Sequence, residues 1–217
     1  MRRIFSALAA VTLLALVAGC GGDGGDAAPG KGSSSKGETA AGVGSLTATE
    51  VQMAMPSGLA APQGWTGARI LVLPEGHPNA SQGCQHDTST TCAGLGARGD
   101  TSYDKTGVSE HQILFTVMSF DTQENARVAM KGLVARVPVA EYPEPPKPID
   151  IKTGAEETHA FSGQTRSGAL QNFALMRIGN VVAQAYSVHE SAAMLEEQAA
   201  RQIERIKLAA AGKNPDA

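Results

Sequence analysis

The feature that most constrains the fold is a predicted β-hairpin near the C-terminus. Residues 170–178 and 181–188 are β-rich runs separated by Gly179-Asn180. Glycine at the first position of a two-residue loop is typical of a type II′ hairpin turn. In that register six side chains share one face, which we expect to be buried: Ala174, Met176, Ile178, Val181, Ala183 and Ala185. The chain is therefore expected to contain an antiparallel sheet.

A long amphipathic helix is predicted directly after the hairpin, starting at Glu190. Its apolar stripe consists of residues at helical spacing: Leu195, Ala199, Ile203, Ile206 and Ala210. The other side carries charged residues, which we interpret as a solvated face with ion pairs along the helix: Glu196, Glu197, Arg201, Glu204 and Arg205. Residues 211–217 are predicted to be a frayed tail.

Two further helices and two strands are predicted upstream. Thr47 and Glu50 have the spacing of a capping box, which predicts a short helix up to Met55. Residues 69–73 are a predicted strand. Residues 111–120 form a second strand, whose two apolar faces favour a central place in the sheet. Asp121 or Thr122 then caps a helix that Pro138 ends.

Residues 77–107 are rich in Gly, Ser, Thr and Asn and show little periodicity, so we expect a long irregular region there. The order of elements favours hairpins and meanders over repeated βαβ units. This predicts an α+β fold, in which helices pack on one side of an antiparallel sheet and a C-terminal hairpin precedes a long helix.

The N-terminus has the parts of a bacterial lipoprotein signal. Arg2 and Arg3 precede an apolar run that ends in Leu16-Val17-Ala18-Gly19-Cys20. The last four residues resemble the bacterial lipobox, in which the cysteine receives a lipid and the peptide before it is removed. This implies a signal peptide at 1–19, a lipidated Cys20, a Gly/Ser/Ala-rich tether to residue 45 and a folded domain over 46–210. A plain signal peptide is the alternative.

The remaining two cysteines, Cys84 and Cys92, are predicted to form a disulfide, because an even pair outside the membrane is expected to oxidise. His77, His86 and Asp87 lie near this pair, so a zinc site or a reactive thiol is an alternative. The Cys-x7-Cys spacing is longer than structural zinc sites favour. We expect no metal and no cofactor.

Composition and motifs exclude several classes of function. The formal net charge is −3 and no basic run occurs, so we expect no nucleic-acid partner. The G-x-G-x-x-G match at 94–99 precedes no predicted helix and is interpreted as a glycine-rich loop. The motifs G-x-S-x-G and H-E-x-x-H are absent. A spatial triad of His111 or His159 with Ser57 or Ser102 and an aspartate is a remaining enzymatic alternative.

Several short motifs resemble those of one family. They are Leu46-Thr47 at a helix start, Gly64-Trp65, Phe120 before a helix that contains Ala126, and the run from Arg177 to Val182. Together they resemble actinobacterial lipoproteins of the PknH-like extracellular sensor-domain group over about residues 46–208. This resemblance implies an antiparallel sheet packed with helices around a cleft, and a ligand-sensing role. The predicted order of elements also resembles that of the PsbP/Mog1-like lipoproteins.

The sequence therefore predicts a non-enzymatic domain, anchored by lipid at the extracytoplasmic face of the cell membrane. Its partner would be an unknown small ligand or an envelope protein. Candidate residues of a ligand site are Trp65, Tyr103, Met118 and Met53. Two alternatives differ in class. One is an envelope interaction or assembly protein without a small ligand, with an exposed patch instead of a pocket. The other is a hydrolase with a spatial triad.

Overall fold

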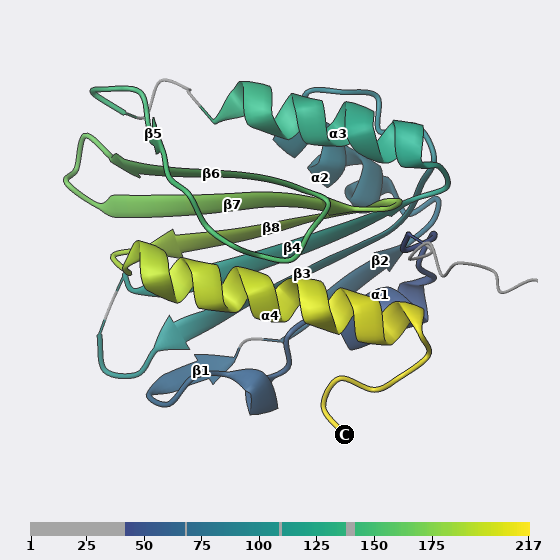
Figure 1. The fold of residues 1–217 in the computed structure, drawn as a ribbon, viewed down its shortest axis with the longest axis horizontal. Coiled ribbons are helices and arrows are strands. Elements are labelled where there is room, and N and C mark those ends of the chain that lie inside the picture. Colours follow the sequence, from purple (N-terminus) through teal and green to yellow (C-terminus); the bar gives the residue numbers. More distant parts are fainter. Residues whose placement is uncertain (1–41, 68, 109, 138–141) are drawn as a thin grey trace, which may run out of the picture. The chain divides into compact units, whose positions relative to one another are not determined.

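An eight-stranded antiparallel sheet forms the centre of the fold (Figure 1). The computed structural model describes residues 42–67, 69–108, 110–137 and 142–217. The strands are β1 (Trp65–Gly67), β2 (Leu71–Pro74), β3 (Leu95–Lys105), β4 (Gln112–Phe120), β5 (Lys147–Pro148), β6 (Glu157–Gln164), β7 (Leu170–Ile178) and β8 (Val181–Val188). The helices are α1 (Ala48–Ala54), α2 (Pro78–Thr88), α3 (Gln123–Arg136) and α4 (Ala192–Ala210), with a short 3₁₀ helix η1 (Gly58–Ala60).

The strand order is β1-β3-β4-β8-β7-β6-β5, with β2 also paired to β3. Strands β4 and β8 are therefore central, as the apolar faces of 111–120 predict. Thr47 caps α1 in a capping box with Glu50, and Thr122 caps α3, in agreement with the sequence. An α+β fold with an antiparallel sheet and a C-terminal hairpin before a long helix is confirmed.

The hairpin has the predicted register. Ile178 pairs with Val181, so Gly179 and Asn180 form a two-residue turn. Gly179 has a φ of +55°, and a Cβ at this position would lie 1.8 Å from the carbonyl oxygen of Val43. Glycine is therefore required both by the turn and by the segment that packs on it. The six side chains predicted to share a face all belong to one buried cluster.

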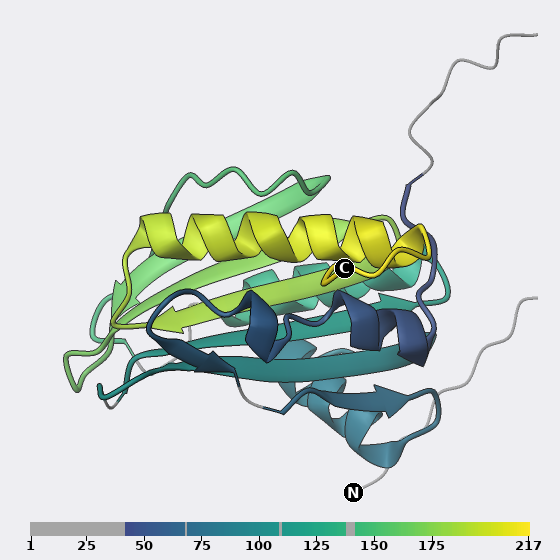
Figure 2. The ribbon, with the colours of Figure 1, turned by 90° about the horizontal axis from the view of Figure 1, so that it is seen from below.

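Helices cover both faces of the sheet, not one (Figure 2). On one face, α1 and α4 bury the hairpin residues together with Ile113, Phe115 and Val117. On the other face, α2 and α3 bury residues of the opposite parity, including Met118, Leu175 and Val182. The expectation of a single helical layer was wrong because the central strands are apolar on both faces, and each apolar face needs a cover.

The expected irregular region at 77–107 is mostly regular structure. Helix α2 begins after His77, whose Nδ1 accepts from the Asn79 amide, and Pro78 occupies its first turn. Strand β3 then pairs with β4 along its length and with β1 and β2 on its other side. The Gly94–Gly99 segment enters this strand at Leu95, so its interpretation as a loop was also wrong.

The C-terminal helix and tail also differ in detail from expectation. Helix α4 begins after Ser191, and Ala209 completes its buried stripe while Ala210 is exposed. Arg205 is buried, although we expected it on the solvated face. Its guanidinium donates to the carbonyl oxygens of Met53, Ala54 and Met55 at the end of α1 and pairs with Asp216 at 2.6 Å. The expected frayed tail is thus bound to α4.

The described fold begins before residue 46. The Asn180 amide donates to the Val43 carbonyl, and the Ser45 hydroxyl donates to the Phe120 carbonyl. The described residues form one compact unit. Over the residues described, no helix is both long enough and apolar enough to cross a membrane.

Candidate functional site: a shelf on the half-covered face

The two helical layers leave one part of the sheet open. We call the side under α2 and α3 the half-covered face, and the side under α1 and α4 the covered face. On the half-covered face, four half-buried side chains form one row across β4, β8, β7 and β6. This row is named the shelf: Leu114, Tyr186, Phe173 and Phe161.

The shelf exists because α3 is too short to cover its strands. Helix α3 has 14 residues and α4 has 19, so they are about 21 Å and 28 Å long at 1.5 Å per residue. Strand β4 has nine residues and extends about 30 Å. On β4, Met118 lies under the helices and is fully buried, whereas Leu114, four residues away on the same face, is half-buried.

The shelf has an aromatic centre. The rings of Phe173 and Tyr186 lie 4.8 Å apart, and Tyr142 meets Phe173 edge-on at 6.3 Å. The Tyr142 hydroxyl donates to Gln171 of β7, which fixes Tyr142 at the border of the row. Aromatic rings held in this way provide a rigid apolar surface for a ligand.

A polar network borders the shelf on the β3 side. Arg98 donates to both carboxylate oxygens of Asp100 at 2.7 and 2.8 Å and to Asp87 at 2.7 Å. Thr116 donates to the same Asp100. Burial opposes the charge on Arg98, but the two aspartates outweigh it and raise its pKa. Gly83 of α2 makes room for this guanidinium, since a Cβ there would lie 3.0 Å from Nη1.

A cavity of about 170 Å³ opens where the shelf meets the helices. It is lined by the ends of α2 and α3 and by the sheet: His86, Asp87, Leu133, Arg136, Val137, Phe173, Leu175 and Gln184. A wider hollow of about 590 Å³ lies at the opposite end of this face, where Gln112 and Val188 meet the turn at 167–169. The shelf therefore runs between two hollows.

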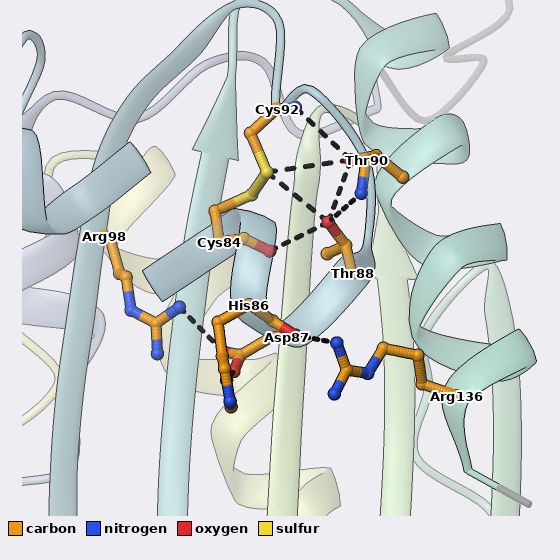
Figure 3. The surroundings of a disulfide bond; sticks show 8 residues. All are labelled: Cys84, His86, Asp87, Thr88, Thr90, Cys92, Arg98 and Arg136. Atoms are coloured by element: carbon orange, nitrogen blue, oxygen red, sulfur yellow. Dashed lines mark hydrogen bonds and ion pairs between the residues drawn. A yellow bond between two sulfur atoms is a disulfide. The ribbon is translucent and has the colours of Figure 1, made fainter. Parts of the chain in front are cut away.

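The disulfide helps to position one wall of the cavity (Figure 3). Cys84 of α2 is bonded to Cys92, as the sequence predicts, with the two Cα atoms 6.2 Å apart. Arg136 of α3 donates to the carbonyl of His86 and to the Ser89 hydroxyl. The end of α2 is thus held covalently to the segment before β3 and by hydrogen bonds to α3, which fixes the cavity wall.

The residues that the sequence singled out for ligand binding do not come together. Tyr103 and Met118 are 1% and 0% exposed and lie on opposite faces of the sheet. The Tyr103 hydroxyl donates to the Ser57 carbonyl, and burial raises its pKa to about 12. Trp65 and Met53 are half-buried against the core of the covered face. Trp65 remains accessible beside Lys105, but at the far edge of the sheet from the shelf.

The other predicted features concern lipidation, histidine pairing and metal binding. Cys20 and the lipobox lie outside the described residues. His111 pairs with Glu190 and His159 with Glu157. In the part of the chain that the structure describes, no histidine is hydrogen-bonded to Ser57 or Ser102, and no group of three or more His, Cys, Asp or Glu residues could hold a metal ion.

Sequence reasoning missed the shelf, although part of its signal was present. Leu114 belongs to one of the two apolar faces predicted for residues 111–120. Phe173 lies next to the predicted core residue Ala174. The row forms because strand pairing places Tyr186 beside both Leu114 and Phe173. Ala80, Cys84 and Thr88 recur every four residues and are buried, a spacing that could have revealed α2.

Comparison with known proteins supports the fold. No family model matches the chain, and no curated protein matches it. Among solved structures, it is similar to the crystal structure of the extracellular domain of PknH from Mycobacterium tuberculosis, with a TM-score of 0.51 and 14% identity. The match covers 76% of this chain and 99% of that domain. The predicted resemblance to the PknH-like group is therefore confirmed at the level of the fold.

Proposed function

We propose that this chain is a non-enzymatic, extracytoplasmic domain that binds a small molecule on the shelf, in the manner of a sensor. A lipid on Cys20 holds it at the membrane. The observation that carries the proposal is the half-buried row of Leu114, Tyr186, Phe173 and Phe161, which lies beside a cavity with both apolar and polar walls. Apolar surface with a few fixed polar groups is the usual composition of a small-molecule site.

Two further observations support this proposal. The fold is similar to that of an extracellular domain of a protein named PknH, although this likeness concerns the fold alone. The basic start, apolar run and cysteine of residues 1–20 are the features of a lipoprotein signal. An enzyme is disfavoured because the carboxylate that lines the cavity, Asp87, is engaged in a structural ion pair with Arg98.

Native mass spectrometry of the protein purified from its own envelope tests the proposal. We expect the mature chain to begin at a lipidated Cys20 and to carry a small molecule that survives mild purification. Leu114→Glu should release that molecule, because it places a charge on the apolar row of the shelf. Val128→Glu is the matched control, since Val128 is 46% exposed on α3.

Loss of the bound molecule from both variants would indicate nonspecific adhesion. Absence of any bound molecule in the wild-type protein, together with stable capture of an envelope protein, would favour an interaction protein instead.

A further inference from the structure

We propose that the molecule bound at this site carries a carboxylate, that Arg136 anchors this group in the cavity, and that the apolar remainder lies along the shelf. This inference rests on the proposed function and names the chemical class of its ligand, a small amphipathic carboxylate. It is drawn from the one half-buried arginine of the described fold that has no acidic partner.

Arg136 differs from the other arginines in its surroundings. Three arginines of the described fold are buried, and each is paired with at least one carboxylate: Arg98 with Asp87 and Asp100, Arg177 with Glu156 and Glu157, and Arg205 with Asp216. Arg136 is half-buried in the last turn of α3 and, within the described ranges, has no carboxylate within 4.0 Å. A partly desolvated guanidinium is stabilised by an anion, so this position favours a carboxylate supplied from outside.

The geometry of Arg136 leaves donors available to a ligand. Within the described residues, its two hydrogen bonds, to the His86 carbonyl and the Ser89 hydroxyl, both use Nη1. These acceptors are neutral and hold the guanidinium in place without neutralising it. Guanidinium has five N–H donors in a planar arrangement that matches the two oxygens of a carboxylate. The remaining nitrogens, Nε and Nη2, can therefore bind a carboxylate through two parallel hydrogen bonds.

Asp87 also lines the cavity, and its carboxylate would repel an anionic ligand if its charge were not compensated. Its Oδ2 accepts from Arg98 at 2.7 Å and its Oδ1 contacts His86 at 3.1 Å. Arg98 also holds Asp100, the other acidic group of this network. Both aspartates are thus engaged by protein groups, whereas the charge of Arg136 is not balanced by any described acid in contact with it. The positive charge of Arg136 can therefore attract one anion into the cavity.

The apolar walls define the rest of the ligand. Leu133, Val137 and Leu175 line the cavity beside Arg136, and Phe173 belongs both to the cavity and to the shelf. A volume of about 170 Å³ is smaller than the ~300–1,000 Å³ of typical ligand pockets. The cavity therefore accommodates the carboxylate and its nearest carbons, and the chain or ring beyond them contacts Phe173, Tyr186 and Leu114.

Nuclear magnetic resonance titration with two matched probes, octanoate and octanol, tests this assignment. The protein is the chain from residue 20 onward with Cys20→Ser, which contains the whole described unit and needs no detergent. We expect octanoate to shift the resonances of Leu133, Phe173 and Gln184 and to bind at least tenfold more tightly than octanol. Arg136→Gln should abolish this preference, because octanoate binding should weaken much more than octanol binding. Arg127→Gln, at an exposed position on the same helix, is the control.

Arg136→Lys separates the charge from the planar donor geometry, and we expect it to retain only part of the preference. Resonances of α4 and the melting temperature report whether each variant remains folded. Equal binding of the two probes at the shelf, unaffected by Arg136→Gln, would overturn the carboxylate assignment and leave the proposed function intact. Shifts confined to residues outside the cavity and shelf, or no shifts, would also overturn it. The native mass measurement on envelope-purified protein then decides the proposed function independently.

Discussion

The covered and half-covered faces of the sheet are built from the same strands but are protected to different degrees. On β4, the covered face presents Ile113, Phe115 and Val117, which are all at most 2% exposed. The alternate residues Leu114 and Thr116 are half-buried, and only Met118 and Phe120 are sealed by the helices. Because successive side chains of a strand point to opposite faces, one strand supplies both a closed core and an accessible surface.

We infer from this difference that the two faces have different roles, stability and binding. A helix as long as the strands seals the covered face, which we expect to supply most of the stability. The shorter helix on the other face leaves an apolar row accessible, which costs stability and is usually retained for binding. Variants on the two faces should therefore differ in their effect on stability.

Truncation of neighbouring residues on β4 should separate the two faces. Ile113 and Leu114 have side chains of equal size and lie side by side in the strand. We expect Ile113→Ala to lower the free energy of unfolding by about 2–5 kcal/mol, because it leaves a cavity in a sealed core. Leu114→Ala should cost about 1 kcal/mol or less, since solvent can fill the space. Urea unfolding of both variants measures this, and equal losses would show that the faces are equally packed.

The disulfide should stabilise the half-covered side locally. Replacement of both Cys84 and Cys92 by serine should lower the free energy of unfolding by about 2–3 kcal/mol, from the entropy of the loop that the bond closes. Hydrogen exchange should accelerate in α2 and remain slow in α4, because the bond restrains only the former side. Uniform acceleration across both helices would contradict this local role.

Arg205 provides a test on the covered side. Arg205→Ala removes the donors to the carbonyls that end α1 and to Asp216, and we expect a loss of about 1–3 kcal/mol. Arg201→Ala on the same helix is the matched control. Arg201 pairs with Glu197 at the surface, so the control should cost less than about 0.5 kcal/mol. A similar small effect from both variants would show that the tail and α1 are held by other contacts.

The smallest effect concerns acid stability at the start of α4. Burial alone would raise the pKa of Glu190, but hydrogen bonds from His111 and Lys105 lower it below its ordinary value. A carboxylate with a lowered pKa in the folded state stabilises the fold above the unfolded pKa, and this stability is lost as the pH falls through the folded value. Glu190→Gln should therefore reduce stability at pH 7 and flatten its decline below about pH 4. If the variant lost stability at low pH as steeply as the wild-type protein, this role of Glu190 would be contradicted.

The sequence predicted the covered face better than the half-covered one. The six hairpin residues that share a buried face follow from strand alternation and one two-residue turn. Helix α2 was missed because its buried stripe consists of the small residues Ala80, Cys84 and Thr88, which carry little hydrophobic signal. Strand β3 was missed because its buried Arg98 is charged and becomes compatible with a strand only through Asp87 and Asp100.

The shelf could not be predicted from local patterns. Its four residues come from four strands and are brought together by register. Their partial exposure depends on where α3 ends, a property of the length of one helix relative to strands elsewhere in the chain. The burial of Arg205 has a similar origin. The sequence places Arg205 among the charges of a solvated helix face, whereas its acceptors at the end of α1 are far away in the sequence. The sequence does not single out Arg136.

Hydroxyl-radical footprinting of the envelope-purified protein tests the central claim most directly, namely that the shelf is the ligand site. The protein is oxidised as purified and again after extraction of bound small molecules with organic solvent and refolding. We predict that oxidation of Phe173 and Leu114 rises after extraction, while Phe115 and Ile113 on the covered face stay protected. Unchanged oxidation of the shelf, or a rise at another surface, would contradict the account.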